Sequence, residues 1–212
     1  MKKSIKDLNL NGKKVILRVD FNVPIADGKI ADMKRIDAAL PTIKYILDNG
    51  ASIILLSHLG RIKTEEDKKS KSLKIVADKL KEMLPNKITF INETRSKEIT
   101  KAAKSLKPGE ILFLENTRFE DLNKKAESSN NPTLAKYWAS LGDVFVNDAF
   151  ATAHRAHAST VGIANYVKES ALGFLMEQEV KELSKLLKGF KRPFISIIGG
   201  AKVSDKLKVL EK

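Results

Sequence analysis

Short apolar runs alternate along this chain with longer segments in which apolar residues recur every three or four positions. Ala51 to Ser57 is almost continuously apolar, which is typical of a strand buried on both faces. Arg35 to Asn49 has a helical spacing instead, with Ile36, Leu40 and Ile43 on one face. Because such strands and helices alternate, the sequence predicts an α/β fold, a three-layer arrangement with a mainly parallel sheet between helices on both of its faces.

The same alternation predicts the other elements of this fold. The predicted strands are Lys14–Phe21, Ala51–Ser57, Lys87–Ile91, Ile111–Leu114 and Asp143–Asn147. The predicted helices are Arg35–Asn49, Leu73–Met83, Ile99–Leu106 and Pro132–Leu141. Pro41 lies inside the first of these helices, and since proline has no amide hydrogen we expect it to kink that helix or to mark a late start. Two polar stretches are expected to form mobile loops, Lys63–Lys71 and Asp121–Asn131.

Near Leu172 the alternation gives way to one long helical pattern, in which apolar residues from Met176 to Phe190 are spaced four and three apart. Beyond it, Phe194 to Ile198 has the pattern of a buried strand, and Gly199-Gly200 leads into a helix from about Val203. A single strand and helix cannot bury their own apolar faces, so we expect a second domain to begin here and to be truncated. The expected parts are a first domain over residues 1–171, a connecting helix over 172–188, and the beginning of a second domain over 189–212.

The composition narrows the class of protein. Of the 212 residues, 42% are hydrophobic and 31% are charged, which is the balance of a globular protein with a sizeable core. There is no cysteine, and this excludes disulfides and thiolate metal sites. No apolar stretch follows the first lysines, and none is long enough to cross a bilayer. We therefore expect a cytoplasmic protein that is a monomer and has no membrane partner.

The formal net charge of +13 makes a nucleic-acid-binding protein an alternative. Most lysines, however, occur singly at the spacing of solvated helix faces, which is typical of a soluble surface. Aromatic residues make up only 6% and do not interleave with basic clusters, so no stacking platform for bases is visible. We therefore expect no nucleic-acid partner.

Polar and charged residues gather directly after the predicted strands. They do so in four segments, Arg18–Pro24, Ser57–Arg61, Glu115–Phe119 and Asn147–His157. In an open parallel sheet, ligands bind beyond the carboxyl ends of the strands, where these segments should meet. Arginine binds phosphate and carboxylate through paired hydrogen bonds, while Asp20 and Asn22 suit hydroxyl groups. The pattern therefore predicts a pocket for a small polyanion that carries hydroxyl groups.

Each of these residues, taken alone, also has a purely structural interpretation. Asp20 could cap a turn and Asn22 could be an ordinary loop residue. His58 could be a buried histidine whose hydrogen bonds are satisfied, and Arg118 could pair with a nearby carboxylate (Glu115 or Glu120). The gathering of all of them at one edge of the sheet favours the binding site.

Five segments of the chain are similar to signature segments of the phosphoglycerate kinases. They are RVDFNVP (Arg18–Pro24), SHLGR (Ser57–Arg61), ENTRF (Glu115–Phe119), NDAFATAHRAHA (Asn147–Ala158) and GGAKVSDK (Gly199–Lys206). They occur in the family's order and with its spacing over essentially the whole chain, so the resemblance is specific. The chain departs from the family in having Ile62 where proline is usual, and in being considerably shorter.

The resemblance implies reversible phosphoryl transfer between ATP and the carboxylate of 3-phosphoglycerate, which gives 1,3-bisphosphoglycerate. It further implies ATP or ADP with magnesium as cofactor, the magnesium ligand lying in a carboxyl-terminal half that this chain lacks. The chain would then carry the acceptor-binding half and would turn over hardly at all by itself. A catalytically silent 3-phosphoglycerate-binding fragment is an open alternative.

The resemblance also implies roles for individual residues. The glycerate part of the substrate would be bound by Asp20 and Asn22, and its phosphate and carboxylate by His58, Arg61, Arg118 and Arg155, with His154 adding to the basic patch. The implied substrate-binding set is completed by Phe21, Arg35, Leu59 and Gly60. Arg35 and Lys202 would act on the phosphoryl group in transfer. The nucleotide would be bound by Gly199, Gly200, Ala201, Lys202 and Lys206.

Overall fold

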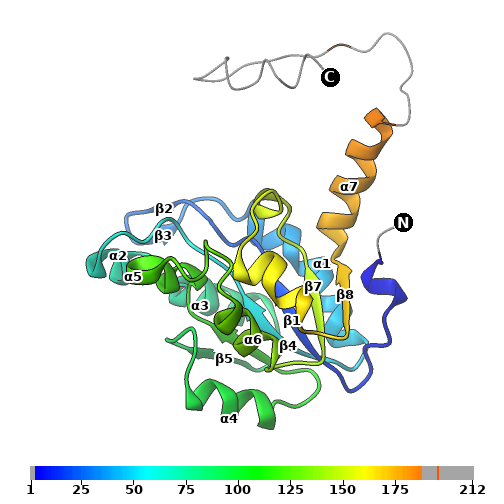
Figure 1. Cartoon of the computed structure of the whole chain (residues 1–212), viewed down its shortest axis with the longest axis horizontal. Helices are drawn as coiled ribbons and strands as arrows, with labels where there is room; N and C mark the ends of the chain where they lie inside the picture. The colour runs from blue at the N-terminus through cyan, green and yellow to red at the C-terminus, as the bar shows by residue number, and fades with distance from the viewer. Residues whose placement is uncertain (1–2, 188–194, 196–212) are drawn as a thin grey trace. The chain divides into compact units, whose positions relative to one another are not determined.

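A computed structural model describes residues 3–187 and 195 of the chain. Its centre is a six-stranded sheet in the order β5-β6-β4-β1-β7-β8, in which every neighbouring pair is parallel (Figure 1). The strands are β1 (Lys14–Arg18), β4 (Ser52–Leu56), β5 (Ile88–Ile91), β6 (Ile111–Leu114), β7 (Val144–Asn147) and β8 (Glu169–Leu172). The predicted α/β fold with a mainly parallel sheet is confirmed.

Helices cover both faces of this sheet. The α-helices are α1 (Lys34–Asp48), α2 (Glu65–Ser70), α3 (Lys74–Met83), α4 (Lys97–Ser105), α5 (Asp121–Lys124), α6 (Pro132–Ala139) and α7 (Phe174–Leu187). Short 3-10 turns are η1 (Ile5–Asp7), η2 (Thr117–Glu120), η3 (Phe150–Thr152) and η5 (Ile163–Asn165), and η4 (Ala158–Gly162) is a single π-helical turn. A separate two-stranded ribbon joins β2 (Ile25–Ala26) to β3 (Lys29–Ile30).

Alternate residues of the strands build two separate cores. On β1, Val15 and Leu17 belong to the core that also contains the apolar faces of α1 and α3. Ile16, between them, belongs to the second core with α4 and α6. This division follows from the pleat, which sends successive side chains to opposite faces of a sheet. The three predicted layers are therefore present, and they fix the carboxyl ends of the strands on a rigid base.

The chain reverses its direction of travel across the sheet next to β1. It passes from β1 to β4 on one side, and later returns to place β7 on the other side. In the register of the sheet, Arg18 at the end of β1 lies opposite Leu56 of β4 and Asn147 of β7. The segments that follow these three strands therefore leave the sheet at one place, which is where ligands bind in open parallel sheets.

The late start proposed for the first helix is wrong. α1 begins at Lys34 and continues through Pro41. Pro41 and Asp37, whose carbonyl the proline cannot bond, both lie on the exposed side of the helix. Water can take the place of the missing hydrogen bond there, so proline is tolerated.

The two predicted polar loops are also partly wrong, because each contains a helix. α2 has no buried residue, but Thr64 caps it through the amide of Asp67, and Asp67 pairs with Lys71. α5 is a single turn that ends at Lys125 in a left-handed conformation. Neither helix has a buried residue, and α2 is held by its cap and charged pairs, so hydrophobic spacing could not reveal them.

A long helix, α7, lies where the connecting helix was predicted, although Leu172 belongs to β8. The chain divides into two compact units, Met1–Glu179 and Val180–Lys212. Apart from Ile195, the predicted strand 194–198 and the helix from Val203 lie outside the described residues, so the division into domains stays a prediction. None of the helices within residues 3–187 is long and apolar enough to span a membrane.

Candidate functional site

The carboxyl ends of β1 and β4 bring three of the predicted site residues together. Asp20 forms an ion pair with Arg35, which opens α1. The other carboxylate oxygen of Asp20 lies 3.9 Å from Nδ1 of His58. Asp20 and His58 are both buried, while the Arg35 side chain is 43% exposed. Arg35 can therefore reach a ligand while its carboxylate partner remains fixed.

His58 is held as a neutral imidazole. Its pKa lies well below the usual value, chiefly because of burial, and the charges of Arg18, Arg118 and other arginines add to the lowering. Nδ1 of His58 lies 3.2 Å from Nη2 of Arg18. At this position the site thus has a neutral hydrogen-bonding group and not a cation.

Asn22 and Gly60 connect the loop after β1 to the loop after β4. The side-chain oxygen of Asn22 accepts a hydrogen bond from the amide of Gly60 at 2.8 Å, and the carbonyl of Gly60 accepts one from Nη1 of Arg118 at 2.8 Å. Gly60 has a φ of +63°, which favours glycine, and an added Cβ would come within 2.9 Å of the Lys71 side chain. The Arg118 guanidinium is therefore positioned by a turn that requires glycine.

Three of the predicted arginines line one hollow of about 360 Å³. They are Arg61, Arg118 and Arg155, and the same hollow is also lined by His157 and by one carboxylate, Asp121. Within the described part of the chain, none of the three arginines has a carboxylate oxygen within 4.0 Å. Burial lowers the pKa of Arg118, and the neighbouring charge of Arg155 adds to this. Guanidinium groups that repel one another without a carboxylate partner form a ready anion site.

Two residues that could have neutralised Arg118 are engaged elsewhere. Glu115 is buried and accepts hydrogen bonds from the Leu73 amide at 2.7 Å and the Ser72 hydroxyl at 2.5 Å, so it caps the start of α3. Glu120 pairs with Arg95 at 2.9 Å. The structural interpretation of Arg118 as a partner of either glutamate is therefore wrong.

A second hollow, of about 270 Å³, lies beside Arg35. Arg35 and Lys34 of α1 line it together with Asp20, and Asp148 and Glu179 contribute carboxylates. Asp148 is fully buried, and burial raises its pKa to about 6. This hollow differs from the first because three carboxylates and two cations line it, whereas Asp121 is the single carboxylate that lines the arginine hollow.

The side chains of the remaining predicted site residues do not line either hollow in the described part of the chain. Phe21 and Leu59 have their side chains in the core, so only their backbone could contact a ligand. His154 is exposed and lines neither hollow. The predicted nucleotide-binding residues Gly199, Gly200, Ala201, Lys202 and Lys206 lie outside the described residues.

The structure also brings in residues that the sequence did not assign to the site. Lys63 and Lys125 line the arginine hollow with His157, and Arg18 contacts His58 from beneath. Arg18 had a signal in the sequence, since it is an arginine at the end of an otherwise apolar strand. Lys63 and Lys125 had none, because they lie in lysine-rich segments that look like ordinary surface.

No group of three or more histidine, aspartate or glutamate side chains suited to a metal ion occurs within the described residues. The part of the chain that the structure describes therefore does not fit a magnesium site, and none is assigned to it.

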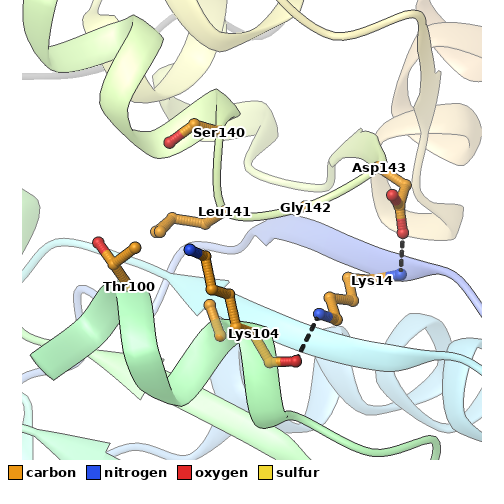
Figure 2. A pocket seen from close by; sticks show the side chains of 8 residues that line it. Lys14, Thr100, Lys104, Ser140, Leu141, Gly142 and Asp143 are labelled. Atoms are coloured by element: carbon orange, nitrogen blue, oxygen red, sulfur yellow. Dashed lines mark hydrogen bonds between the residues drawn. The ribbon is translucent and has the colours of Figure 1, made fainter. Parts of the chain in front are cut away.

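Another hollow, of about 150 Å³, lies at the amino ends of the strands, opposite the carboxyl ends that carry the candidate site (Figure 2). There the Lys14 ammonium donates to the carbonyl of Lys104 at 3.0 Å, and the Lys14 amide donates to Asp143 at 2.8 Å. These contacts tie the start of β1 to α4 and to the turn before β7. Because this edge holds the amino ends of the strands, the hollow is not the candidate ligand site.

Comparison with known proteins identifies the class of protein. The family model described as phosphoglycerate kinase matches residues 5–212. Phosphoglycerate kinases of Enterococcus faecalis and Fusobacterium nucleatum are 60% identical over 210 residues and 61% identical over 213 residues, covering 99% and 100% of this chain. The solved structure of phosphoglycerate kinase from Coxiella burnetii covers 100% of this chain with a TM-score of 0.85 and 41% identity.

The chain therefore belongs to the phosphoglycerate kinase family, as its motifs predicted. It spans about half the length of these three relatives, covering 53% of the Enterococcus protein, 54% of the Fusobacterium protein and 51% of the Coxiella structure. The matched half includes all of the strands around the candidate site.

Proposed function

We propose that this chain is the acceptor-binding half of a phosphoglycerate kinase and binds 3-phosphoglycerate between the two hollows. The observation that carries this proposal is the arginine hollow, where Arg61, Arg118 and Arg155 lack carboxylate partners among the described residues. The neighbouring Asp20 and Asn22 supply acceptors for a hydroxyl group. A small molecule with a phosphate at one end, a hydroxyl and a carboxylate matches this series of groups.

In this proposal the phosphate of the substrate lies against Arg61, Arg118 and Arg155. The hydroxyl lies near Asp20 and Asn22, and the carboxylate lies toward Arg35 and His58. Phe21, Leu59 and Gly60 contribute backbone, while His154 adds positive charge at the rim.

The reaction proposed for the whole protein is transfer of the terminal phosphoryl group of ATP to the substrate carboxylate. A carboxylate oxygen forms a bond to phosphorus, the bond from phosphorus to the bridging oxygen breaks, and ADP leaves. The carboxylate is already ionised at neutral pH, so no general base is required. Alignment and positive charge stabilise the transition state, and among the described residues we assign the supply of that charge to Arg35.

The nucleotide side is assigned to residues 189–212 and to a carboxyl-terminal half. We propose that Gly199, Gly200, Ala201, Lys202 and Lys206 contact the nucleotide phosphates, and that Lys202 also meets the transferred group. Since the described residues offer no magnesium site, the isolated chain should bind the acceptor with little turnover. The length of the relatives supports this second candidate, a binding-only fragment. A cytoplasmic monomer fits the proposal.

Calorimetric titration of the chain with 3-phosphoglycerate tests this function. Arg118→Ala should weaken binding by about 10- to 100-fold, because it removes a charge-assisted hydrogen bond to the phosphate. Arg95→Ala is the matched control, since Arg95 is a half-exposed arginine that pairs with Glu120 away from the hollow. Equal affinity for the wild type and both variants would remove the arginine hollow from the binding site.

A further inference from the structure

A buried network of hydrogen bonds is centred on Arg18 and includes His58, a residue of the proposed substrate site. Arg18 is only 1% exposed although it carries a permanent charge. Its Nε donates to the hydroxyl of Ser159 at 2.8 Å, and Nη1 donates to the carbonyl of Val19. Its Nη2 lies 3.2 Å from Nδ1 of His58. The guanidinium therefore connects the end of β1 to the loop after β4 through His58, and to η4 through Ser159.

The charge of Arg18 is compensated inside the protein. Glu127 is fully buried and accepts hydrogen bonds from the Ser159 amide at 3.0 Å and from the Ser159 hydroxyl. The Ser159 hydroxyl thus accepts from Arg18 and donates to Glu127. Burial raises the pKa of Glu127, and the Arg18 charge works against that rise. The pair differs from the three arginines of the hollow, which have no such partner among the described residues.

The contact with Arg18 determines which ring nitrogen of the neutral His58 carries the proton. A guanidinium has only donors, so Nδ1 of His58 must be the acceptor of the Arg18 hydrogen bond. A neutral imidazole carries one proton, which then resides on Nε2. The charged groups around His58 are Arg18, Arg35, Arg118, Arg155 and Asp20, the last at 3.9 Å from Nδ1.

We propose that Arg18, held by Glu127 through Ser159, is a positioning residue that fixes His58 in its neutral Nε2–H form and so provides a hydrogen-bond donor for an oxygen of the acceptor substrate. The substrate part of this inference rests on the proposed function, whereas the tautomer part does not. Nε2–H has no acceptor among the residues that the structure describes, so it is available to a ligand. A neutral donor binds oxygen without adding to the charge that the three arginines already supply.

Nitrogen-15 NMR of the histidine side chains tests the tautomer directly. The chain has only three histidines, so the signals can be assigned with single substitutions of His154 and His157. In the wild type we expect a neutral His58 with the proton on Nε2, unchanged from about pH 6 to 8 because its pKa is low. A proton on Nδ1, or a charged His58 in this range, would overturn the proposal.

Two variants separate the action of Arg18 from a general loss of packing. Glu127→Gln keeps the Arg18–His58 contact, so His58 should keep the Nε2–H form. Arg18→Met combined with Glu127→Gln leaves no unpaired buried charge, and His58 should become a mixture of tautomers with a higher pKa. If the double variant does not fold, the wild-type spectrum still decides the tautomer, and Arg18→Lys, which keeps the buried charge but cannot donate to both Ser159 and His58, replaces the double variant. An unchanged His58 spectrum in the folded double variant would overturn the role of Arg18.

Affinity for 3-phosphoglycerate supplies the second measurement. The double variant should bind about tenfold more weakly than Glu127→Gln, which is the usual effect of one misplaced hydrogen bond. Arg95→Met controls for loss of an arginine elsewhere and should bind like the wild type. If the wild type does not bind at all, the proposed function fails while the tautomer result stands by itself. Equal affinities of the two Glu127 variants would remove His58 from substrate binding.

Discussion

Asp148 accepts a hydrogen bond from the backbone amide of Met176 at 3.1 Å, so a buried carboxylate at the end of β7 caps the first turn of α7. Thr42 of α1 accepts from the amide of Phe174 at 3.0 Å in the same turn. The other oxygen of Asp148 is buried and has no hydrogen-bond partner. The start of α7 is therefore tied to the site-bearing sheet through a carboxylate that is only partly satisfied.

The burial of Asp148 predicts a pH dependence of stability. Its pKa is raised from 3.8 to about 6, so the folded state holds this proton more tightly than the unfolded state does. The contribution is favourable at low pH and is lost as the pH rises from about 4 to 6, which costs about 3 kcal/mol in total. Asp148→Asn should lack this loss. From low pH to pH 7, the unfolding free energy of the variant should therefore rise relative to that of the wild type.

Urea unfolding at pH 4.5 and 7 measures this effect. Asp48→Asn, a change at an exposed carboxylate at the end of α1, is the control and should leave the difference constant. A difference between Asp148→Asn and the wild type that does not vary with pH would show that Asp148 has an ordinary pKa.

Gly173 should be intolerant of any side chain because of the same cap. An added Cβ would lie 2.4 Å from Cγ of Asp148, which is buried and cannot move away. Gly173→Ala should therefore destabilise the protein by about 2–3 kcal/mol. Gly12→Ala is the matched comparison, since a Cβ there would meet nothing within 4 Å and only its φ of +69° is unfavourable. It should cost about 1 kcal/mol, and equal losses in both variants would contradict the clash.

The parts of the fold that the sequence predicted are those in which burial dominates. β4 and β6 are buried at every position, so their apolar runs marked them clearly. β8 escaped prediction because it is an edge strand with two exposed residues, and its pairing with β7 depends on the rest of the sheet. The β2–β3 ribbon is held by a turn at Asp27 and Gly28, both with positive φ, and has little apolar surface to reveal it.

The same distinction applies to the candidate site. Arg61, Arg118 and Arg155 were predictable because each follows a strand and the edge of a parallel sheet gathers such residues. The neutral state of His58 was not, because it depends on Arg18 and on burial, which arise only when distant segments fold together. Family resemblance supplied the roles, but the protonation state required the structure.

Binding of the acceptor should depend on salt less steeply than binding to nucleic acid would. A single small anion contacts few cations, and a partly buried site is screened weakly, so affinity should fall only several-fold from 50 to 200 mM salt. A protein that bound nucleic acid through its net charge of +13 should lose about a thousandfold or more in affinity over the same range of salt. Calorimetry with 3-phosphoglycerate and gel-shift titration with duplex DNA make the comparison. Retention of DNA at physiological salt would favour the nucleic-acid alternative.

Activity should return only when the chain is supplied with a carboxyl-terminal half from a relative. Phosphoryl transfer needs the acceptor and the nucleotide aligned in one closed site, and the proposed function assigns most of the nucleotide site to a carboxyl-terminal half. A coupled assay of the isolated chain should therefore show almost no turnover, while the mixture of halves should show turnover that depends on the concentration of both.

Arg35→Ala separates chemistry from acceptor binding in this mixture. Since the proposed function assigns Arg35 to the transferred phosphoryl group, loss of Arg35 should lower turnover by at least about 100-fold. The affinity of the isolated chain for 3-phosphoglycerate should fall far less than it does in Arg118→Ala, since the proposed function assigns the phosphate of the substrate to Arg118. Arg95→Ala should leave both quantities unchanged. Full turnover by the isolated chain would show that the nucleotide site lies within these 212 residues, and a large loss of affinity in Arg35→Ala would place Arg35 in ground-state binding.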